Sequence, residues 1–472
     1  MVRELKPLSF ADWEMTQQGV RMEPMLQAIA DFLSDHDELI DAVGCDLRAG
    51  LKNPDTGRSG LAAAQVLRSL VLMRIKDWDY RELRERIADG YTLRQFTAFH
   101  CQPVPRHDAF HRAFVKLKPN TMKVVNDLIV QAAVELGLED GAKLRVDSTV
   151  VQSDIHHPTD NTLLWDVVRV VTRLAIRLGK AIKPRRIKAF SNRTRAAHRR
   201  MYEIQRMTSR QRFTQQAEKY HALILIAEEV VTSAREALRQ TEKARGKALH
   251  DDIVIGQLRA EIDHYCGLGD RVINQTRRRV AEGEAVPSAD KLYSIFEPHT
   301  DLIKRGKVQT PMEFGHKVFL AESAQGLITQ YQVLNGNPVD DHHVRPSLKR
   351  HRKAFGRAPA LYSSDRGFFS EDNLAACARG GVKVICIPQR GGAKTPERAA
   401  FEKSDAFKKG QRFRAGVEGR ISVLMRGRGM KRCRAEGLQR FEVFVAAAVL
   451  ANNLMRIGTL LEAATRRRCR AA

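Results

Sequence analysis

Residues 359–388 read PALYSSDRGFFSEDNLAACARGGVKVICIP, and this stretch decides the fold. Residues 360–364 form a short apolar strand that ends at a carboxylate, Asp365. Ser370 can cap a helix with acidic residues in its first turn and a Gly-Gly pair at its end. Residues 382–387 then predict a buried strand. This order predicts a βαβ unit with two parallel strands, and Asp365 lies at a carboxyl strand end, where sites form in open α/β sheets.

The composition favours a folded, basic protein. The chain has 472 residues, of which 43% are hydrophobic, so it can form two or three domains with real cores. Its net charge is +25, which favours a polyanionic partner such as nucleic acid. The alternative is a basic surface that has no specific partner.

The cysteines and the apolar runs predict a cytoplasmic protein. The seven cysteines are scattered and none forms a CxxC pair, which favours reduced thiols and disfavours a structural zinc site. No uninterrupted apolar run reaches the roughly 18 residues of a membrane span, and no signal-peptide core follows the first residues. We therefore expect no membrane partner.

Hydrophobic periodicity divides the chain into four parts. Residues 1–140 show short helical patterns and predict an all-helical N-terminal domain that would allow a helix-turn-helix for DNA binding. Residues 156–311 predict a basic helical or coiled-coil insertion. Residues 141–155 and 312–461 form the core around it, and residues 462–472 are a loose basic tail.

The core predicts a mixed sheet. Without the insertion, its order is strand, strand, strand, helix, strand, helix, strand, helix, beginning with the strand at residues 143–151. The first three strands suit an antiparallel meander and the last two can add in parallel. A mixed five-stranded sheet with flanking helices in this order matches the ribonuclease H-like fold.

Three acids lie at positions that this topology would bring together at one edge of the sheet. Asp147 lies in the middle of the first strand, Asp365 ends the fourth, and Glu418 lies on the helix after the fifth. A carboxylate in a core strand is costly to bury unless it is paired or bound to metal. Mg²⁺ prefers oxygen ligands, and two such ions can stabilise both the attacking and the leaving oxygen of a phosphoryl displacement. The three acids together therefore predict a two-metal site, with Asp147 the candidate bridge.

Five short motifs carry a resemblance to a known family. They are YREL at 80–83, DST at 147–149, SDRGF at 364–368, RAGVEGRIS at 414–422 and ANNL at 451–454. With these motifs the chain resembles bacterial insertion-sequence transposases of the DDE type, and it is most similar to the group called ISNCY. The resemblance covers nearly the whole chain except the detail of residues 156–311.

The resemblance implies DNA transposition. The protein would bind the terminal inverted repeats of an insertion sequence as a homodimer, cut at the ends and join the 3′-hydroxyls to target DNA. Asp147, Asp365 and Glu418 would hold Mg²⁺, with Mn²⁺ able to substitute. The alternatives are a catalytically inactive descendant that only binds DNA and a nuclease with the same ribonuclease H-like fold.

Basic side chains near the acids and in the insertion are candidates for phosphate contacts. The dense basic run at residues 180–212 is either such a surface or a solvated face. Many relatives carry Lys or Arg seven residues after the Glu, where this chain has Met425. Arg420 and Arg426 are the candidate substitutes, and a decayed copy is the alternative. The full set of candidates is Lys317, Arg366, Arg414, Arg420, Arg426, Arg185, Arg186, Arg199 and Arg200.

Overall fold

A computed structural model describes residues 10–53, 56, 60–182, 190–242, 249–304 and 312–471 of the chain. These residues fall into two compact units, one made of residues 1–152 and 316–472 and the other of residues 153–315. The second unit contains the expected insertion. No division between compact units falls at the boundary expected near residue 140.

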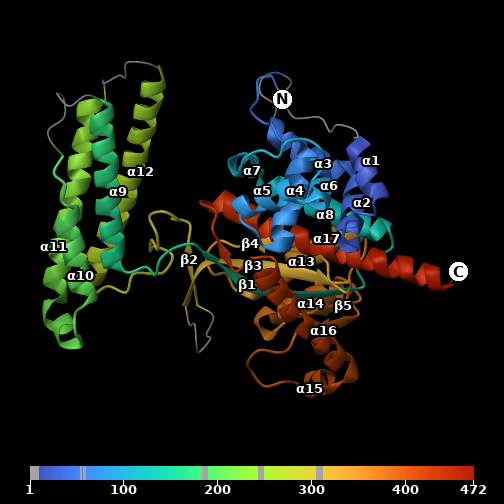
Figure 1. Cartoon of the computed structure of the whole chain (residues 1–472). Coiled ribbons are helices and arrows are strands. Elements are labelled where there is room, and N and C mark those ends of the chain that lie inside the picture. Colours follow the sequence, from blue (N-terminus) through green and yellow to red (C-terminus); the bar gives the residue numbers. More distant parts are fainter. Residues whose placement is uncertain are drawn as a thin grey trace. The chain divides into compact units, whose positions relative to one another are not determined.

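The N-terminal helices and the last helix of the chain form one hydrophobic core. The last helix, α17 (Leu438–Ala471), contacts α2, α4 and α8 as well as the sheet, and Figure 1 shows it in red beside the blue helices. The expected loose tail is wrong in this respect, because α17 continues through residues 462–471. The N-terminal helices are α1 (Phe10–Gln17), α2 (Pro24–Ser34), α3 (Asp37–Arg48), α4 (Ala63–Lys76), α5 (Tyr80–Asp89), α6 (Tyr91–Phe96), α7 (His107–Phe114) and α8 (Pro119–Glu135).

Helix α17 is apolar because it is a core helix. Its segment Leu438–Arg466 is long and apolar enough to cross a membrane by composition, but 72% of its most apolar window is buried inside the protein. Residues 445–451 are buried without exception and pack against the N-terminal helices. The burial explains the composition without any membrane.

Among the described residues the sheet has seven strands, two more than the expected five. Its strand order is β2-β3-β1-β5-β6, where β2 is Asp301–Lys304, and β4 pairs with β3 off this path. The strands β3 and β4 are antiparallel, whereas β5 is parallel to both β1 and β6. A two-residue strand, β7 (Arg432–Cys433), also pairs with β1. This mixed α/β arrangement is compatible with a ribonuclease H-like domain. The main strands are β1 (Lys143–Ser153), β3 (Met312–Ser323), β4 (Ile328–Val333), β5 (Leu361–Ser363) and β6 (Val384–Cys386).

Side chains of β3 alternate between the two faces of the sheet. Val318 and Leu320 belong to the core formed with α17 and the N-terminal helices. Phe319 and Ala321 belong to a second core, formed with α13 (Val344–Phe355) and α14 (Glu371–Arg379). Helices therefore cover both faces, as a largely buried sheet requires.

The predicted βαβ unit is present. The helix α14 between β5 and β6 begins at Ser370, whose hydroxyl accepts a hydrogen bond of 3.2 Å from the amide of Asn373. After β6 the chain forms two more helices, α15 (Pro396–Lys403) and α16 (Asp405–Ser422). Thr395 and Ser404 cap these helices, and a Thr-Pro-Glu sequence is a recognisable helix start.

A buried triad of charges holds α16 against the sheet. Glu322 on β3 is fully buried and accepts from Arg145 on β1 at 2.7 Å and from Arg420 on α16 at 2.9 Å. Arg145 also donates to the carbonyl of Phe413 on α16 at 2.6 Å. Arg420 donates to Asn452 of α17 at 3.1 Å. Four elements are thus connected through one buried carboxylate.

Asn453 fixes α17 to β4. Asn453 accepts from the amide of Ile328 at 2.8 Å and donates to the carbonyl of the same residue at 2.9 Å. It also donates to Asn126 of α8 at 2.9 Å. Asn453 thus satisfies backbone groups that would otherwise be buried without partners.

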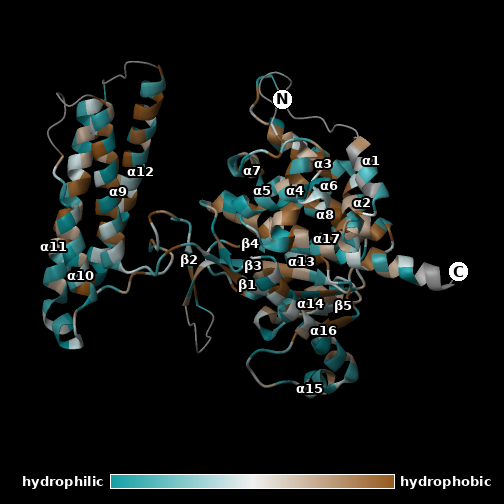
Figure 2. Cartoon of the chain, viewed as in Figure 1, coloured by the Kyte–Doolittle hydropathy of each residue, from teal (hydrophilic) through white to brown (hydrophobic). Residues whose placement is uncertain are grey.

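The second unit is a helical bundle with a short hairpin. Its helices are amphipathic, with brown and teal residues along their length in Figure 2, and they pack around their own core. Trp165 packs against this core, with its ring 4.9 Å from the ring of His198. The strand β2 (Asp301–Lys304) pairs with the start of β3 at Met312–Gly315. The helices are α9 (Asp160–Ala181), α10 (Thr194–Gln205), α11 (Ser209–Thr241) and α12 (Leu249–Val280).

Two glycines of α16 give a matched test of how closely this helix packs against the sheet. A Cβ at Gly410 would overlap the Sγ of Cys386 on β6, whereas a Cβ at Gly419 meets nothing within 4 Å. We expect Gly410→Ala to lower the free energy of unfolding by about 1–3 kcal/mol through overpacking. We expect Gly419→Ala to raise it by about 0.5–1 kcal/mol through helix propensity. Urea denaturation of both variants checks this, and equal effects would contradict the close contact between α16 and β6.

Candidate active site

Asp147 is a nearly buried carboxylate on β1. Its side chain is 14% exposed, and its Oδ1 accepts a 2.7 Å hydrogen bond from the amide of Ser148. Burial raises the pKa of Asp147 to about 6, although Arg414 opposes this shift. The carboxylates of Asp365 and Asp340 raise its pKa further. Asp147 therefore lies in a desolvated place that already holds other negative charges.

Asp365 lies directly after β5, where the opening stretch of sequence predicts it. Its Oδ1 accepts a 2.8 Å hydrogen bond from the amide of Gly367, and it caps the short 3₁₀ turn η2 (Arg366–Phe368). Because β5 is parallel to β1 and pairs with it, the end of β5 lies close to the middle of β1. The turn holds the carboxylate at this edge of the sheet.

Glu418 is connected to Asp147 through Arg414. Arg414, one helical turn earlier on α16, donates to Glu418 at 3.0 Å and to Asp147 at 3.2 Å. The arginine is 20% exposed, while Glu418 is 67% exposed. A single guanidinium therefore joins two of the three predicted acids, and Asp147 interacts electrostatically with the third.

A fourth acid, Asp340, lies beside these three and was not predicted. It begins the 3₁₀ turn η1 (Asp340–His343), and its Oδ1 accepts from Ser148 at 2.7 Å and from Lys317 at 2.8 Å. The sequence at 335–341 reads NGNPVDD. The Asp-Asp pair directly after a proline turn was the available signal.

The chemistry of these side chains fits a divalent cation. All are carboxylates, which Mg²⁺ and Mn²⁺ accept as ligands, and two of them face a cation, Arg414, that occupies the space between them. Among the described residues, no group of three or more His, Cys, Asp or Glu side chains is already close enough to hold a metal ion. Binding would therefore require Arg414 to release at least one carboxylate.

Three of the residues expected to contact phosphate are engaged by partners within the protein. Arg420 is engaged with Glu322 and Asn452 inside the protein, so it acts in the buried triad. Lys317 is 11% exposed and donates to Asp340 and to the carbonyl of Pro338. Arg414 is also partnered, by the two acids of the site.

Other expected contacts remain accessible. Arg366 and Arg426 are exposed, and so is Arg199 on α10. Arg200 is half-buried and donates to Glu203 at 2.9 Å. Arg185 and Arg186 lie outside the described residues.

A π-turn changes how Met425, seven residues after Glu418, is interpreted. Residues Val423–Gly427 form a π-helical turn, η3, directly after α16. In a regular α-helix, the residue seven positions after Glu418 returns to its face, but a π-turn accommodates one extra residue. The extra residue moves that position to Arg426, which is exposed, while Met425 packs against the hydrophobic core. Arg426 donates to Ser422 at 2.6 Å, which holds its guanidinium along the helix.

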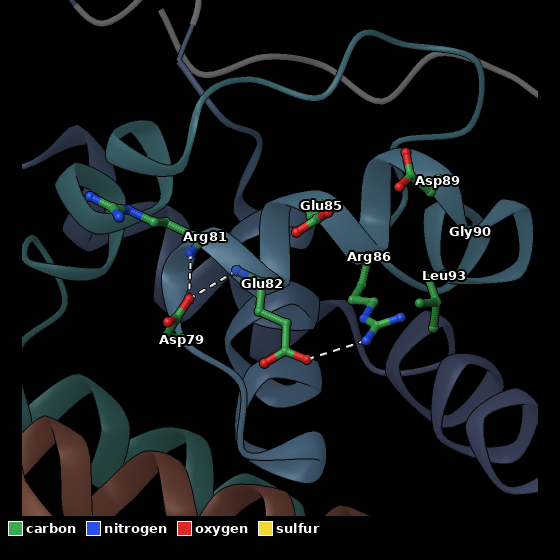
Figure 3. Close-up of a pocket in the computed structure, with 8 residues that line it drawn as sticks. All are labelled: Asp79, Arg81, Glu82, Glu85, Arg86, Asp89, Gly90 and Leu93. Atoms are coloured by element: carbon green, nitrogen blue, oxygen red, sulfur yellow. Dashed lines mark hydrogen bonds and ion pairs between the residues drawn. The ribbon is translucent and has the colours of Figure 1, made fainter.

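A hollow beside α5 in the N-terminal part does not resemble a phosphate-binding surface. Figure 3 shows Asp79 capping α5 through the amides of Arg81 and Glu82, and the ion pair between Glu82 and Arg86. Four acids and two arginines line this hollow, so its charge is negative. DNA binding by this part of the chain would have to use another face.

The raised pKa of Asp147 predicts a pH-dependent effect of its replacement. At pH 3 the carboxyl is mostly neutral in both the native and the unfolded state, whereas above pH 6 the native state must hold a desolvated charge. Without metal, we expect the difference in unfolding free energy between Asp147→Asn and the wild type to rise by up to about 3 kcal/mol from pH 3 to pH 7. Urea denaturation across this range, in EDTA, measures it. A difference that is constant with pH would contradict the raised pKa.

Comparisons with known proteins address only part of the chain. No curated protein and no solved structure matches it. Residues 303–454 match the family model described as the transposase DDE domain. The match includes Asp340, Asp365 and Glu418, and it begins after the strand that carries Asp147. This match supports a DDE-type transposase, in agreement with the motifs around the acids.

Proposed function

We propose that the protein is a transposase that cleaves DNA at the ends of an insertion sequence and transfers the strands to target DNA, using Mg²⁺ or Mn²⁺. The observation that supports this most is the position of Arg414, which donates to Asp147 and Glu418 at once. These two acids are 271 residues apart in the sequence, yet one guanidinium reaches both. Such convergence of carboxylates suits a phosphoryl-transfer site.

The residues that would hold the metal are Asp147, Asp365 and Glu418. When bound, divalent cations supply a nucleophilic oxygen at neutral pH and stabilise the leaving oxygen. In the free protein Arg414 favours the ionised form of Asp147, because its positive charge opposes the rise in pKa that burial causes. On loading, Arg414 is free to turn toward a phosphate of the substrate.

The finer parts of the proposal follow the family resemblance. We propose binding to terminal inverted repeats, a homodimer that joins two ends, membership of the ISNCY group and action in the cytoplasm. The rival function is DNA binding without cleavage, which Met425 suggested. The position of Arg426 on the face of Glu418 argues against it, because the basic residue is still available there.

Replacing the acids should separate chemistry from binding. We expect Asp147→Asn, Asp365→Asn and Glu418→Gln each to reduce cleavage of a labelled inverted-repeat end by at least about 10³-fold, because a lost ligand removes the charge stabilisation that the metal provides. DNA affinity should remain within a few-fold of the wild type. End cleavage with Mg²⁺ and gel-shift titration measure the two properties.

The outcomes distinguish the alternatives. Wild-type protein that binds the repeat but never cuts it would support the inactive descendant. Hydrolysis without joining to target DNA would support the nuclease. An equal loss of DNA binding in all three variants would count against metal ligation by these acids.

The π-turn gives a prediction about Arg426. We expect Arg426→Ala to weaken DNA binding and to reduce the slope of log affinity against log salt concentration by about 1, because one phosphate contact is lost. The matched control is the double variant Met425→Arg/Arg426→Met, which keeps the net charge but moves it by one residue. We expect no rescue, and wild-type binding by the control would show that net charge alone matters.

A further inference from the structure

The unpredicted carboxylate, Asp340, has the contacts of a fourth member of the active site. It lies on η1, after β4, and it reaches the first-strand motif through Ser148, the residue that follows Asp147. It also lies close to the turn η2, which follows Asp365. A Cβ added to Gly367 would lie 3.0 Å from Oδ1 of Asp365 and 3.5 Å from Oδ2 of Asp340. The two carboxylates therefore flank the same glycine, which has no side chain to separate them.

The local charge calls for a cation. The four carboxylates of Asp147, Asp340, Asp365 and Glu418 face two paired cations, Lys317 and Arg414. When all are ionised, this group carries a formal charge of −2 within a chain whose net charge is +25. A divalent cation would neutralise the group, and a substrate phosphate alone would worsen its repulsion.

The oxygen atoms show how Asp340 would take part. Its Oδ1 is used by Ser148 and Lys317, while its Oδ2 faces Gly367 and has no hydrogen-bond partner in the described part of the chain. Lys317 is nearly buried and holds a second bond, to the carbonyl of Pro338. It therefore occupies the neighbourhood of Asp340 as a fixed internal cation.

We propose that Asp340 is a further ligand of the divalent cation, and that Lys317 competes with this cation for Asp340 in the free protein. The inference rests on the proposed function, because it assigns a fourth acid to the same metal site. Lys317 then acts as a counter-ion that holds Asp340 in position until the metal binds. The phosphate contact first expected of Lys317 is replaced by this role.

The test measures metal affinity without any reaction. Mn²⁺ binding to the full-length protein is titrated by electron paramagnetic resonance, without DNA, for the wild type and for Asp340→Asn, Lys317→Met and Asp372→Asn. Asp372 is an exposed acid on α14 that pairs with Arg345, so it is the matched control. We expect Asp340→Asn to weaken Mn²⁺ binding by about tenfold or more, as the loss of groups around a metal does.

The lysine variant makes the test decisive. If Lys317 competes with the metal, Lys317→Met strengthens Mn²⁺ binding several-fold, in the opposite direction to Asp340→Asn. If Asp340 only holds Ser148 and Lys317 in place, both variants weaken binding or neither changes it, and either result overturns the proposal. Asp340→Glu, which keeps the carboxylate, should bind more tightly than Asp340→Asn and provides the comparison if the Asn variant does not fold.

Failure of this inference is distinguishable from failure of the proposed function. If Asp147→Asn abolishes Mn²⁺ binding while Asp340→Asn behaves like Asp372→Asn, the metal site stands and Asp340 is not part of it. If the wild type binds no Mn²⁺, or if Asp147→Asn binds Mn²⁺ as tightly as the wild type, both proposals fail.

Discussion

The geometry of the site depends on one buried carboxylate, Glu322. Its two arginine partners come from β1 and α16, so the interaction sets the distance between the strand and the helix that carry acids of the site. A buried charge that loses its partner costs about 3–5 kcal/mol of stability. Here Glu322, Arg145 and Arg420 would lose their partners together. The helix therefore cannot slide along the sheet without leaving a buried charge uncompensated. Gly416 permits this arrangement, since a Cβ there would overlap the guanidinium of Arg145.

The structural and the candidate catalytic residues alternate along the same two elements. On β1, Arg145 enters the triad and Asp147, two residues later on the same face, enters the site. On α16, Arg420 points toward Glu322 while Glu418 stays 67% exposed. The triad thus fixes the backbone, and the acids keep the freedom to change partners. A site that must bind metal and DNA needs this combination of a rigid frame and exchangeable side chains.

The sequence predicted what local patterns determine. The strand that ends at Asp365, the helix capped by Ser370 and the parallel strand after it follow from turn and capping chemistry, and all are present. Asp340 and the role of Arg420 were missed because they depend on contacts between residues that are far apart in sequence. Arg420 and Glu322 are 98 positions apart, and no periodicity links them. The π-turn was missed for another reason: it changes the helical register that the pattern argument assumed, so Met425 appeared to replace a basic residue that Arg426 supplies.

The internal cations explain how such a site can exist before metal binds. Four carboxylates at one edge of a sheet would repel one another, and the charges of Asp365 and Asp340 contribute to the raised pKa of Asp147. Arg414 and Lys317 limit the repulsion because each is held by a second interaction, Arg414 by Glu418 and Lys317 by the carbonyl of Pro338. Their difference in exposure then separates their roles. Arg414 lies on a helix at the edge of the site and can turn outward, whereas Lys317 is more enclosed and pairs with Asp340 in the free protein. The free protein is therefore an ion-paired form of the site, and the proposed divalent cation would have to displace these internal cations from the carboxylates.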